Sequence, residues 1–297
     1  MTLPVLVWFV LATIWGSTWL FIKVGLEAGL PPITFVGLRF VVAVVPLVIW
    51  MVARRVRLPT SRADWRLMTW TGLVTFSLNY GLVFWGESHI TSGLAAILYS
   101  TFPIMGMAVA HVMLRDERLS ARKVTGVFLA VAGVTLIFAN EIQLSGRMAV
   151  LGSSAIVLAA GMTAYATVAI KKSGSHIEPV ALSLVQMSVG LIPMLAIGIP
   201  LEGNPLRYDW SPEAIVAIVY LGIMGSSVTF VLLYWLMQRM QVTRTQLIPL
   251  WSTLIAVLLG HVVLGEGFGG RVLAGGSAIL LGLLVATRPS PAAIEKT

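Results

Sequence analysis

Long apolar runs separated by short polar connectors occupy nearly the whole chain. Ten runs can be counted, at residues 3–27, 31–52, 65–86, 90–114, 122–140, 148–170, 178–200, 212–237, 243–265 and 271–288. A helix of about twenty apolar residues is long enough to cross a hydrocarbon core roughly 30 Å thick. Charged residues make up only 11% of the 297 residues, whereas a soluble domain carries about 25%. The sequence therefore predicts an all-α polytopic membrane protein with ten transmembrane helices.

The basic residues are concentrated in alternate connectors. Fifteen Lys and Arg residues fall on one side of the predicted spans, and four fall on the other side. Because cytoplasmic connectors are enriched in Lys and Arg, this asymmetry predicts that both termini lie in the cytoplasm. The net charge of +8 therefore reports membrane orientation, and we expect no nucleic-acid partner.

The second half of the sequence repeats the first. Shifts of 147 to 150 residues align Pro32 with Pro179, Gly72 with Gly222 and Gly133 with Gly282, and lay IWGSTWLFIK at 14–23 over MTAYATVAIK at 162–171. We therefore expect two five-helix repeats, at residues 1–144 and 145–288, followed by a disordered cytoplasmic tail at 289–297. Because five is odd, the second repeat crosses the membrane inverted relative to the first. Inverted repeats are a transporter architecture, with the substrate site between them near the midplane.

Several stretches carry a resemblance to a known family. They are IWGSTWLFIKVGL near the start, PPITFVGLRF, LYSTFPIMGMAVAHVMLRDERLSARKVTGVFLAVAGVTLI, and LGEGFGGRVLAGGSAILLGLLV near the end. With them, the chain resembles the drug/metabolite transporter superfamily and its EamA-type branch over nearly its whole length. The resemblance implies two inverted five-helix repeats, export of a small solute from the cytoplasm and a bacterial inner-membrane location. The Trp and Tyr content is similar to that of YddG-like exporters of aromatic amino acids.

Polar and aromatic residues inside the predicted spans identify candidate cavity positions. Trp15, Thr18 and Trp19 share one helix face by i, i+3, i+4 spacing. Lipid offers no partner to an amide such as Asn79, which must face other helices or a wet cavity. Pro103 removes a helix hydrogen bond, which is tolerated beside a cavity or a neighbouring helix. The other candidates are Tyr80, Tyr99, Tyr165, Tyr234, Gln246 and Trp251. Helix packing explains each one singly as well, but together they predict a substrate-binding cavity with aromatic walls.

Charged residues within the predicted spans are rare. Arg39 is the one Lys or Arg clearly inside a span, where it can either snorkel to the outer interface or face the interior. No Asp or Glu falls in the middle of a span, which favours facilitated movement or exchange over ion-driven pumping. The sequence has no Walker A loop, HExxH or GxSxG motif and no cysteine. We therefore expect no enzyme activity, no cofactor and no metal.

These observations favour a secondary transporter that moves small amphipathic metabolites by alternating access between the two repeats. Amino acids with aromatic or large apolar side chains fit a cavity with aromatic walls and a few hydrogen-bonding groups. The alternatives are a passive channel and a membrane enzyme acting on lipid intermediates. The expected partners are the small-molecule substrate and the lipid bilayer, and the chain is compatible with a monomer.

Overall fold

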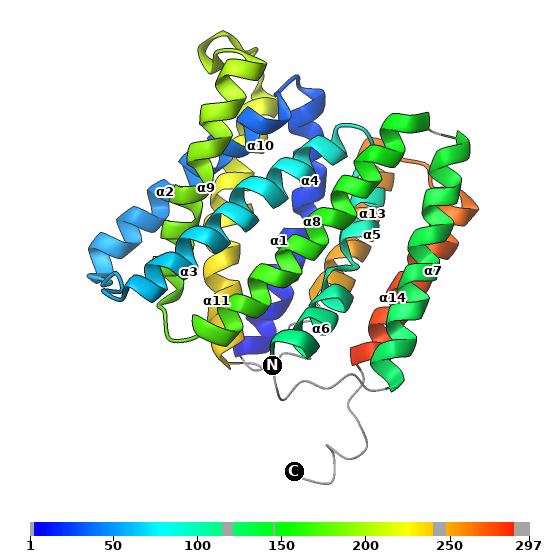
Figure 1. Cartoon of the computed structure of the whole chain (residues 1–297). Helices are drawn as coiled ribbons and strands as arrows, with labels where there is room; N and C mark the ends of the chain where they lie inside the picture. Colours follow the sequence, from blue (N-terminus) through cyan, green and yellow to red (C-terminus); the bar gives the residue numbers. More distant parts are fainter. Residues whose placement is uncertain (1–2, 115–120, 145, 240–247, 288–297) are drawn as a thin grey trace.

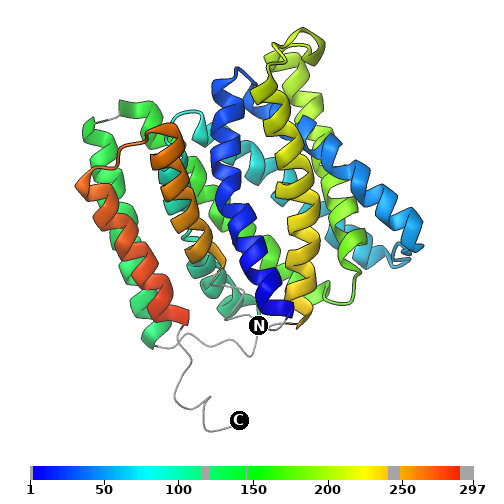
Figure 2. The same cartoon turned by 180° about the vertical axis from the view of Figure 1, so that it is seen from behind.

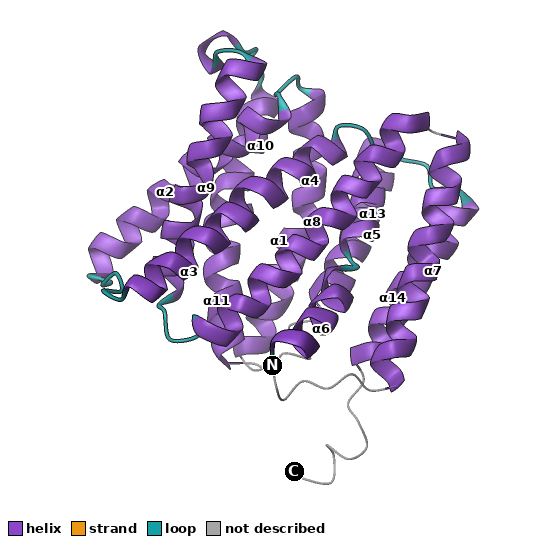
Figure 3. Ribbon diagram, viewed as in Figure 1, coloured by secondary structure: helices purple, strands orange, loops and turns teal. Residues whose placement is uncertain are grey.

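The computed structural model describes residues 3–114, 121–144, 146–239 and 248–287, which are helical apart from short connectors (Figure 3). The first half contains α1 (Leu3–Glu27), α2 (Pro32–Arg54), α3 (Arg62–Gly72), the π-helix η1 (Leu73–Asn79), α4 (Tyr80–Glu87), α5 (Ser92–Tyr99), α6 (Phe102–Met113) and α7 (Ala121–Leu144). The second half contains α8 (Gly146–Ser173), α9 (Pro179–Glu202), the 3-10 helix η2 (Pro205–Arg207), α10 (Pro212–Gly222), the π-helix η3 (Ile223–Val228), α11 (Thr229–Arg239), α13 (Ile248–Leu264) and α14 (Gly270–Thr287). No strand occurs within these ranges.

Seven continuous helical stretches in the described ranges are long and apolar enough to cross a membrane. They are Leu3–Glu27, Pro32–Arg54, Arg62–Glu87, Ser92–Met113, Gly146–Ser173, Pro179–Glu202 and Pro212–Arg239. Shorter apolar helices lie at Val124–Gly133, Trp251–Leu264 and Gly270–Val285. The all-helical, multi-pass membrane protein is confirmed, and the number of ten crossings stays a prediction.

Proline and serine residues determine where several helices begin. Pro32, Pro179 and Pro212 lie in the first turn of α2, α9 and α10, where a missing N–H leaves no hydrogen bond unmade. The Ser211 side chain accepts a hydrogen bond from the N–H of Ala214 and so caps α10. These sharp starts keep the connectors short.

Three of the long helical stretches are irregular near their middle. The π-helices η1 and η3 each begin directly after a glycine of the repeat pair Gly72 and Gly222. The helices α5 and α6 are separated at Ser100 and Thr101, shortly before Pro103. Proline cannot donate a backbone hydrogen bond, and its ring disrupts the preceding turn. The break between α5 and α6 therefore follows from the sequence.

Each half of the chain donates an equivalent hydrogen bond to the other half. The Ser77 hydroxyl in η1 donates to the Gly190 carbonyl in α9 at 2.8 Å, and the Ser227 hydroxyl in η3 donates to the Ala43 carbonyl in α2 at 2.7 Å. The shifts that align the two halves of the sequence also relate these two hydrogen bonds. A two-fold relation between similar units produces this kind of reciprocal contact.

The helices α7 and α14 pack along each other (Figures 1 and 2). A Cβ atom at Gly133 would clash with the carbonyl oxygen of Gly275, and a Cβ atom at Gly282 would clash with that of Gly126. A shift of 149 residues relates both pairs. Glycine is required on both helices because the two backbones approach each other directly.

The helix α1 begins and α14 ends at one end of the molecule, which is lowest in Figure 1 and is called the lower end. The connectors α1–α2, α4–α5, α9–α10 and α13–α14 lie at the opposite, upper end. The connectors are thus divided between two opposite ends of the molecule.

Replacing Gly133 by valine should force the backbones of α7 and α14 apart. Overpacking of this kind costs roughly 1–3 kcal/mol, so we expect the detergent-purified variant to melt at a lower temperature than the wild type. The matched control is Gly270→Ala, where a Cβ atom would meet open space. Equal melting temperatures for Gly133→Val and the wild type would contradict the close packing of the two helices.

Candidate functional site

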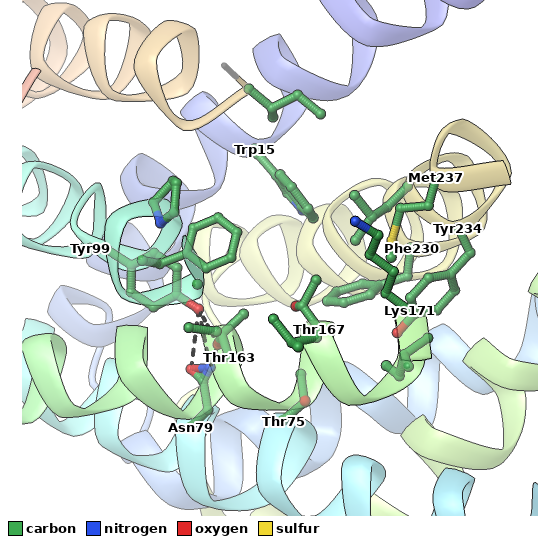
Figure 4. Close-up of a pocket in the computed structure, with 18 of the residues that line it drawn as sticks. Trp15, Thr75, Asn79, Tyr99, Thr163, Thr167, Lys171, Phe230, Tyr234 and Met237 are labelled. Carbon is green, nitrogen blue, oxygen red and sulfur yellow. Dashed lines mark hydrogen bonds between the residues drawn. The ribbon is translucent and has the colours of Figure 1, made fainter. Parts of the chain in front are cut away.

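A central cavity of about 220 Å³ lies between the helices (Figure 4). Side chains from both halves of the chain line it, and they come from α1, α2, η1, α4, α5, α6, α8, α9, α11 and α13 or from the residues that adjoin them. Eight of the eleven positions expected from the sequence are part of this lining: Trp15, Thr18, Trp19, Asn79, Tyr80, Tyr99, Pro103 and Tyr234. The helix face predicted from Trp15, Thr18 and Trp19 is therefore directed towards the interior.

Two of the expected positions lie elsewhere. The Tyr165 side chain is 46% exposed, and its ring packs against Trp70 at 5.4 Å between centroids. The Trp251 indole donates to the Thr13 hydroxyl at 3.3 Å on the outer side of α1, and Ser252 takes part in the cavity lining instead. Both tyrosine and tryptophan tolerate an interface with lipid, so residue type alone did not determine their direction. Gln246 lies outside the described residues.

A polar cluster joins three helical elements on one wall of the cavity. The Asn79 amide donates to the Tyr99 hydroxyl at 3.1 Å and also to the Thr163 hydroxyl. The hydroxyls of Tyr99 and Thr163 are 2.6 Å apart, and Figure 4 shows the three side chains meeting. Asn79 thus finds its partners inside the protein, as a buried amide in a membrane must.

Aromatic rings form much of the remaining wall. The Trp19 ring meets Tyr99 edge-on at 5.5 Å between centroids, and the Trp15 ring meets Phe230 edge-on at 5.9 Å. The Tyr80 ring lies 6.5 Å from Phe230. Edge-on pairs at these separations are favourable and leave ring faces available to a ligand.

The sequence reasoning missed several lining residues, among them Thr163, Thr167 and Phe230. The internal repeat carried a signal for two of them, because the 148-residue shift aligns Trp15 with Thr163 and Trp19 with Thr167. The same shift aligns Tyr165 with Ser17. Ser17 faces away from the cavity and bonds to the Tyr220 hydroxyl at 2.5 Å. Applying the 148-residue shift to the cavity-facing positions of α1 would therefore have predicted that Thr163 and Thr167 line the cavity and that Tyr165 does not.

A lysine ties two helical elements together beyond the upper end of the cavity. There the lining ends in the buried side chains of Ile22 and Val83. The Lys23 ammonium donates to the carbonyl of Glu87 at 3.2 Å and to the carbonyl of Ile90 at 3.0 Å. These hydrogen bonds satisfy carbonyl groups at the end of α4 and tie α1 to the α4–α5 turn.

Two carboxylates reinforce the upper end by capping helices. Glu202, at the end of α9, accepts from the N–H groups of Ile33 at 3.0 Å and Thr34 at 2.7 Å in the first turn of α2. Glu266 accepts from the N–H groups of Ser92 at 2.7 Å and Gly93 at 3.0 Å at the start of α5. An acidic group at a helix N-terminus pairs unbonded N–H groups and complements the helix dipole.

The cavity reaches the surface at the lower end. The exposed residues Ser175 and Gln238 belong to its lining there. Lys171, which the repeat aligns with Lys23, also lies in this mouth, on the same side of the cavity as Met237 and Tyr234 (Figure 4). In the part of the chain that the structure describes, the cavity is therefore open at the lower end and closed at the upper end.

Two charged residues are deeply buried beside this closed end. Arg39 is only 1% exposed and lines the cavity, so it does not snorkel to the interface. Glu87 is completely buried, and neither of its carboxyl oxygens has a hydrogen-bond partner in the described part of the chain. The sequence analysis considered only carboxylates in the middle of a span and so did not consider Glu87, which ends α4. No cluster of three or more possible metal-ligating side chains occurs among the residues that the structure describes.

The profile of the EamA-like transporter family matches this chain twice, at residues 2–139 and 150–288. The chain is 25% identical to the uncharacterized transporter YoaV of Bacillus subtilis, over 92% of this chain and 93% of that protein. It is 27% identical to the uncharacterized inner membrane transporter YedA of Escherichia coli, over 93% of this chain and 86% of that protein. A crystal structure of a protein with 19% sequence identity shares the fold, with a TM-score of 0.68 and 96% of that chain covered.

The Lys23 contacts predict that the upper end depends on one side chain. Lys23→Met retains the length of the side chain but removes its three donors, so the carbonyls of Glu87 and Ile90 lose their partner. We expect spin labels at Glu27→Cys and Ser88→Cys to give a broader and longer distance distribution in this variant. Lys172→Met, at the exposed lower end, is the control and should leave the distribution unchanged. An unchanged distribution in Lys23→Met would mean that other contacts alone hold the upper end closed.

Proposed function

This chain belongs to the EamA-like transporter family, and we propose that it exports small amphipathic metabolites from the cytoplasm by alternating access. The family and its named relatives are transporters rather than enzymes. The central cavity is the proposed substrate site. Its lining includes Trp15, Thr18, Trp19, Asn79, Tyr80, Tyr99, Pro103 and Tyr234 from the sequence analysis.

The observation that carries this proposal is the difference between the two ends of the cavity. Lys23 ties α1 to the α4–α5 turn at the closed end, whereas the exposed residues Ser175 and Gln238 line the mouth at the other end. If the repeats are two inverted units of five helices, exchanging the arrangements of the two halves would close the mouth and open the other side. A solute would then cross without a continuous pore.

The chemistry of the lining supports an amphipathic substrate. The rings of Trp15, Trp19 and Phe230 offer apolar surface, and the cluster of Asn79, Tyr99 and Thr163 offers hydrogen-bonding groups. Binding pockets for small molecules combine predominantly apolar walls with a few placed polar groups. We therefore propose amino acids with aromatic or large apolar side chains as substrates.

A passive channel is the main alternative, and the closed upper end argues against it. A channel would need a polar path to both sides, whereas the lining ends in Ile22 and Val83. Counterflow distinguishes the two mechanisms, because only an alternating-access carrier accelerates uptake of labelled solute when unlabelled solute is present on the other side.

We further propose a bacterial inner-membrane location with both termini in the cytoplasm. The support comes from the fifteen-to-four distribution of Lys and Arg between the two sets of connectors and from the relative YedA, which is named as an inner membrane transporter. In this orientation the lower end is cytoplasmic, and the open mouth receives solute from inside the cell.

Variants of the polar cluster test the substrate site. In proteoliposomes tested with a panel of labelled amino acids, we expect Asn79→Ala and Tyr99→Phe to reduce counterflow by about tenfold, since each leaves buried polar groups without partners or removes a solute contact. Trp251→Ala and Tyr165→Ala are controls of similar chemistry outside the cavity and should retain counterflow. Normal transport by both cluster variants, at wild-type protein levels, would disprove the assignment of the site.

Membrane orientation can be tested in intact cells because the chain has no cysteine. A single cysteine at Leu206, which is 88% exposed, should react with a membrane-impermeant thiol reagent added outside. A cysteine at the exposed Thr60, at the other end of the molecule, should react only after the membrane is permeabilised. The reverse pattern would mean that the cavity opens to the outside.

A further inference from the structure

Arg39, whose side chain takes part in the cavity lining, holds a buried hydrogen-bond donor that has no partner among the described residues. Its side chain is 1% exposed, and two of its nitrogens are bound to η3. Nε donates to the Ser226 hydroxyl at 2.8 Å, and Nη2 donates to the Gly225 carbonyl at 2.8 Å. The third nitrogen, Nη1, has no partner among the described residues. A guanidinium group carries five N–H donors, so this side of Arg39 is left unpaired.

The protein stabilises the Arg39 charge only in part. The guanidinium carbon lies 4.6 Å from the centre of the Tyr80 ring, and the rings of Phe40 and Phe84 are within 6 Å. Aromatic faces attract a cation, but they do not satisfy an N–H group. No ion pair joins Arg39 to a carboxylate in the described ranges. The Tyr80 side chain is its strongest polar neighbour, and Glu87 contributes a weaker, longer-range attraction. A buried charge without its full set of partners is costly.

The repeat provides an internal comparison. The shift of 147 residues aligns Arg39 with Gln186 in α9. The Gln186 amide nitrogen donates to the Thr71 hydroxyl at 2.7 Å, and its oxygen accepts from the Tyr234 hydroxyl at 2.7 Å. The protein therefore satisfies both ends of the equivalent side chain by itself. The unpaired donor is specific to Arg39, which is also the member of the pair that lines the cavity.

The charge of the cavity lining also favours a negatively charged ligand. Among the described residues, the lining contains the cations Arg39 and Lys171 and no aspartate or glutamate. Arg39 lies deep in the cavity, beside Tyr80, while Lys171 lies at the mouth. A cavity with one sign of charge and apolar walls concentrates ligands of the opposite sign.

We propose that Nη1 of Arg39 binds a carboxylate group of the transported solute, so that the substrates are carboxylate-bearing molecules. This inference rests on the proposed transport function and specifies its substrate class. The carboxylate would complete the hydrogen bonds of the guanidinium group, and the apolar part of the solute would extend along Trp15, Trp19 and Phe230 towards the mouth. Among the described lining residues an ammonium group would meet only neutral oxygens, so the carboxylate, rather than the amine of an amino acid, is the group that the site selects.

Four related probes separate these contributions in a binding assay on the purified protein. They are phenylalanine, 3-phenylpropanoate, phenylalaninamide and phenethylamine, and quenching of tryptophan fluorescence reports binding because Trp15 and Trp19 line the cavity. We expect the wild type to bind the two carboxylates and to bind the amide and the amine at least about tenfold more weakly, which is the effect of losing one charge-assisted hydrogen bond. Equal affinity for the acids and for the amide, or no binding of either acid, would overturn the proposal.

Variants of Arg39 then assign the effect to this side chain. Arg39→Gln introduces the residue of the other repeat and should weaken both carboxylates about tenfold or more, with no loss for phenethylamine, and Arg39→Lys should retain part of the affinity because it keeps the charge. Lys171→Gln, at the mouth, is the control for a general loss of positive charge and should have a smaller effect. If Arg39→Gln fails to fold, as judged by gel filtration, the comparison of Arg39→Lys with the wild type is decisive. Unchanged carboxylate affinity in a folded Arg39 variant would refute the proposal.

Transport measurements distinguish a failure of this inference from a failure of the proposed function. If a solute without a carboxylate shows counterflow that Arg39→Gln does not change, the proposed transport function stands and the proposed carboxylate subsite is wrong. If carboxylates bind in a manner that depends on Arg39 but none of them shows counterflow, the carboxylate subsite is supported and the export of these molecules is contradicted.

Discussion

Lipid offers no hydrogen bonds to a backbone that departs from the regular helix, so irregular backbone persists in a membrane only where protein or a wet cavity adjoins it. In this chain η1, η3 and the break between α5 and α6 are such departures. The hydroxyls of Ser77 and Ser227 tie the two π-helices to carbonyls of the opposite half. The π-helix η1 in turn supplies Thr75 and Asn79 to the cavity lining, and Tyr99 of the lining directly precedes the break between α5 and α6. Two of the three irregular segments thus adjoin the cavity.

The charged groups divide into two sets with different roles. Glu202 and Glu266 are bound to helix N-termini at the upper end, and Lys23 is bound to backbone carbonyls there. These groups hold helices together and leave no charge for a ligand. Arg39, by contrast, joins α2 to η3 with two of its nitrogens and keeps the third unpaired in the cavity lining. The side chain proposed to hold the solute is therefore part of the joint between the two halves.

Sequence reasoning identified the interior face of α1 because the spacing of Trp15, Thr18 and Trp19 places them on one side of a helix. It identified Asn79 because an amide has no partner in lipid. It also selected Tyr165 and Trp251, which lie outside the central cavity lining, since an aromatic residue with a polar group is as stable at a packed outer surface as in a cavity. It left the direction of Arg39 open, because the flexible side chain could reach either the interface or the interior. The partners of Arg39 are in η3, about 190 residues further along the chain, where no local pattern could indicate them.

The sequence by itself determined the membrane environment, the helical fold and the repeat between the halves. These properties depend on the length of the apolar runs, on the need to satisfy the backbone within each span and on similarity along the chain. The tertiary structure alone decided how each helix is rotated about its axis, which polar groups meet and which end of the cavity is closed. Helical spacing fixes the angles between side chains on one helix, but the direction of the whole set depends on the helices that pack around it. The cluster of Asn79, Tyr99 and Thr163 shows this dependence, because its members come from three elements that the chain brings together only on folding.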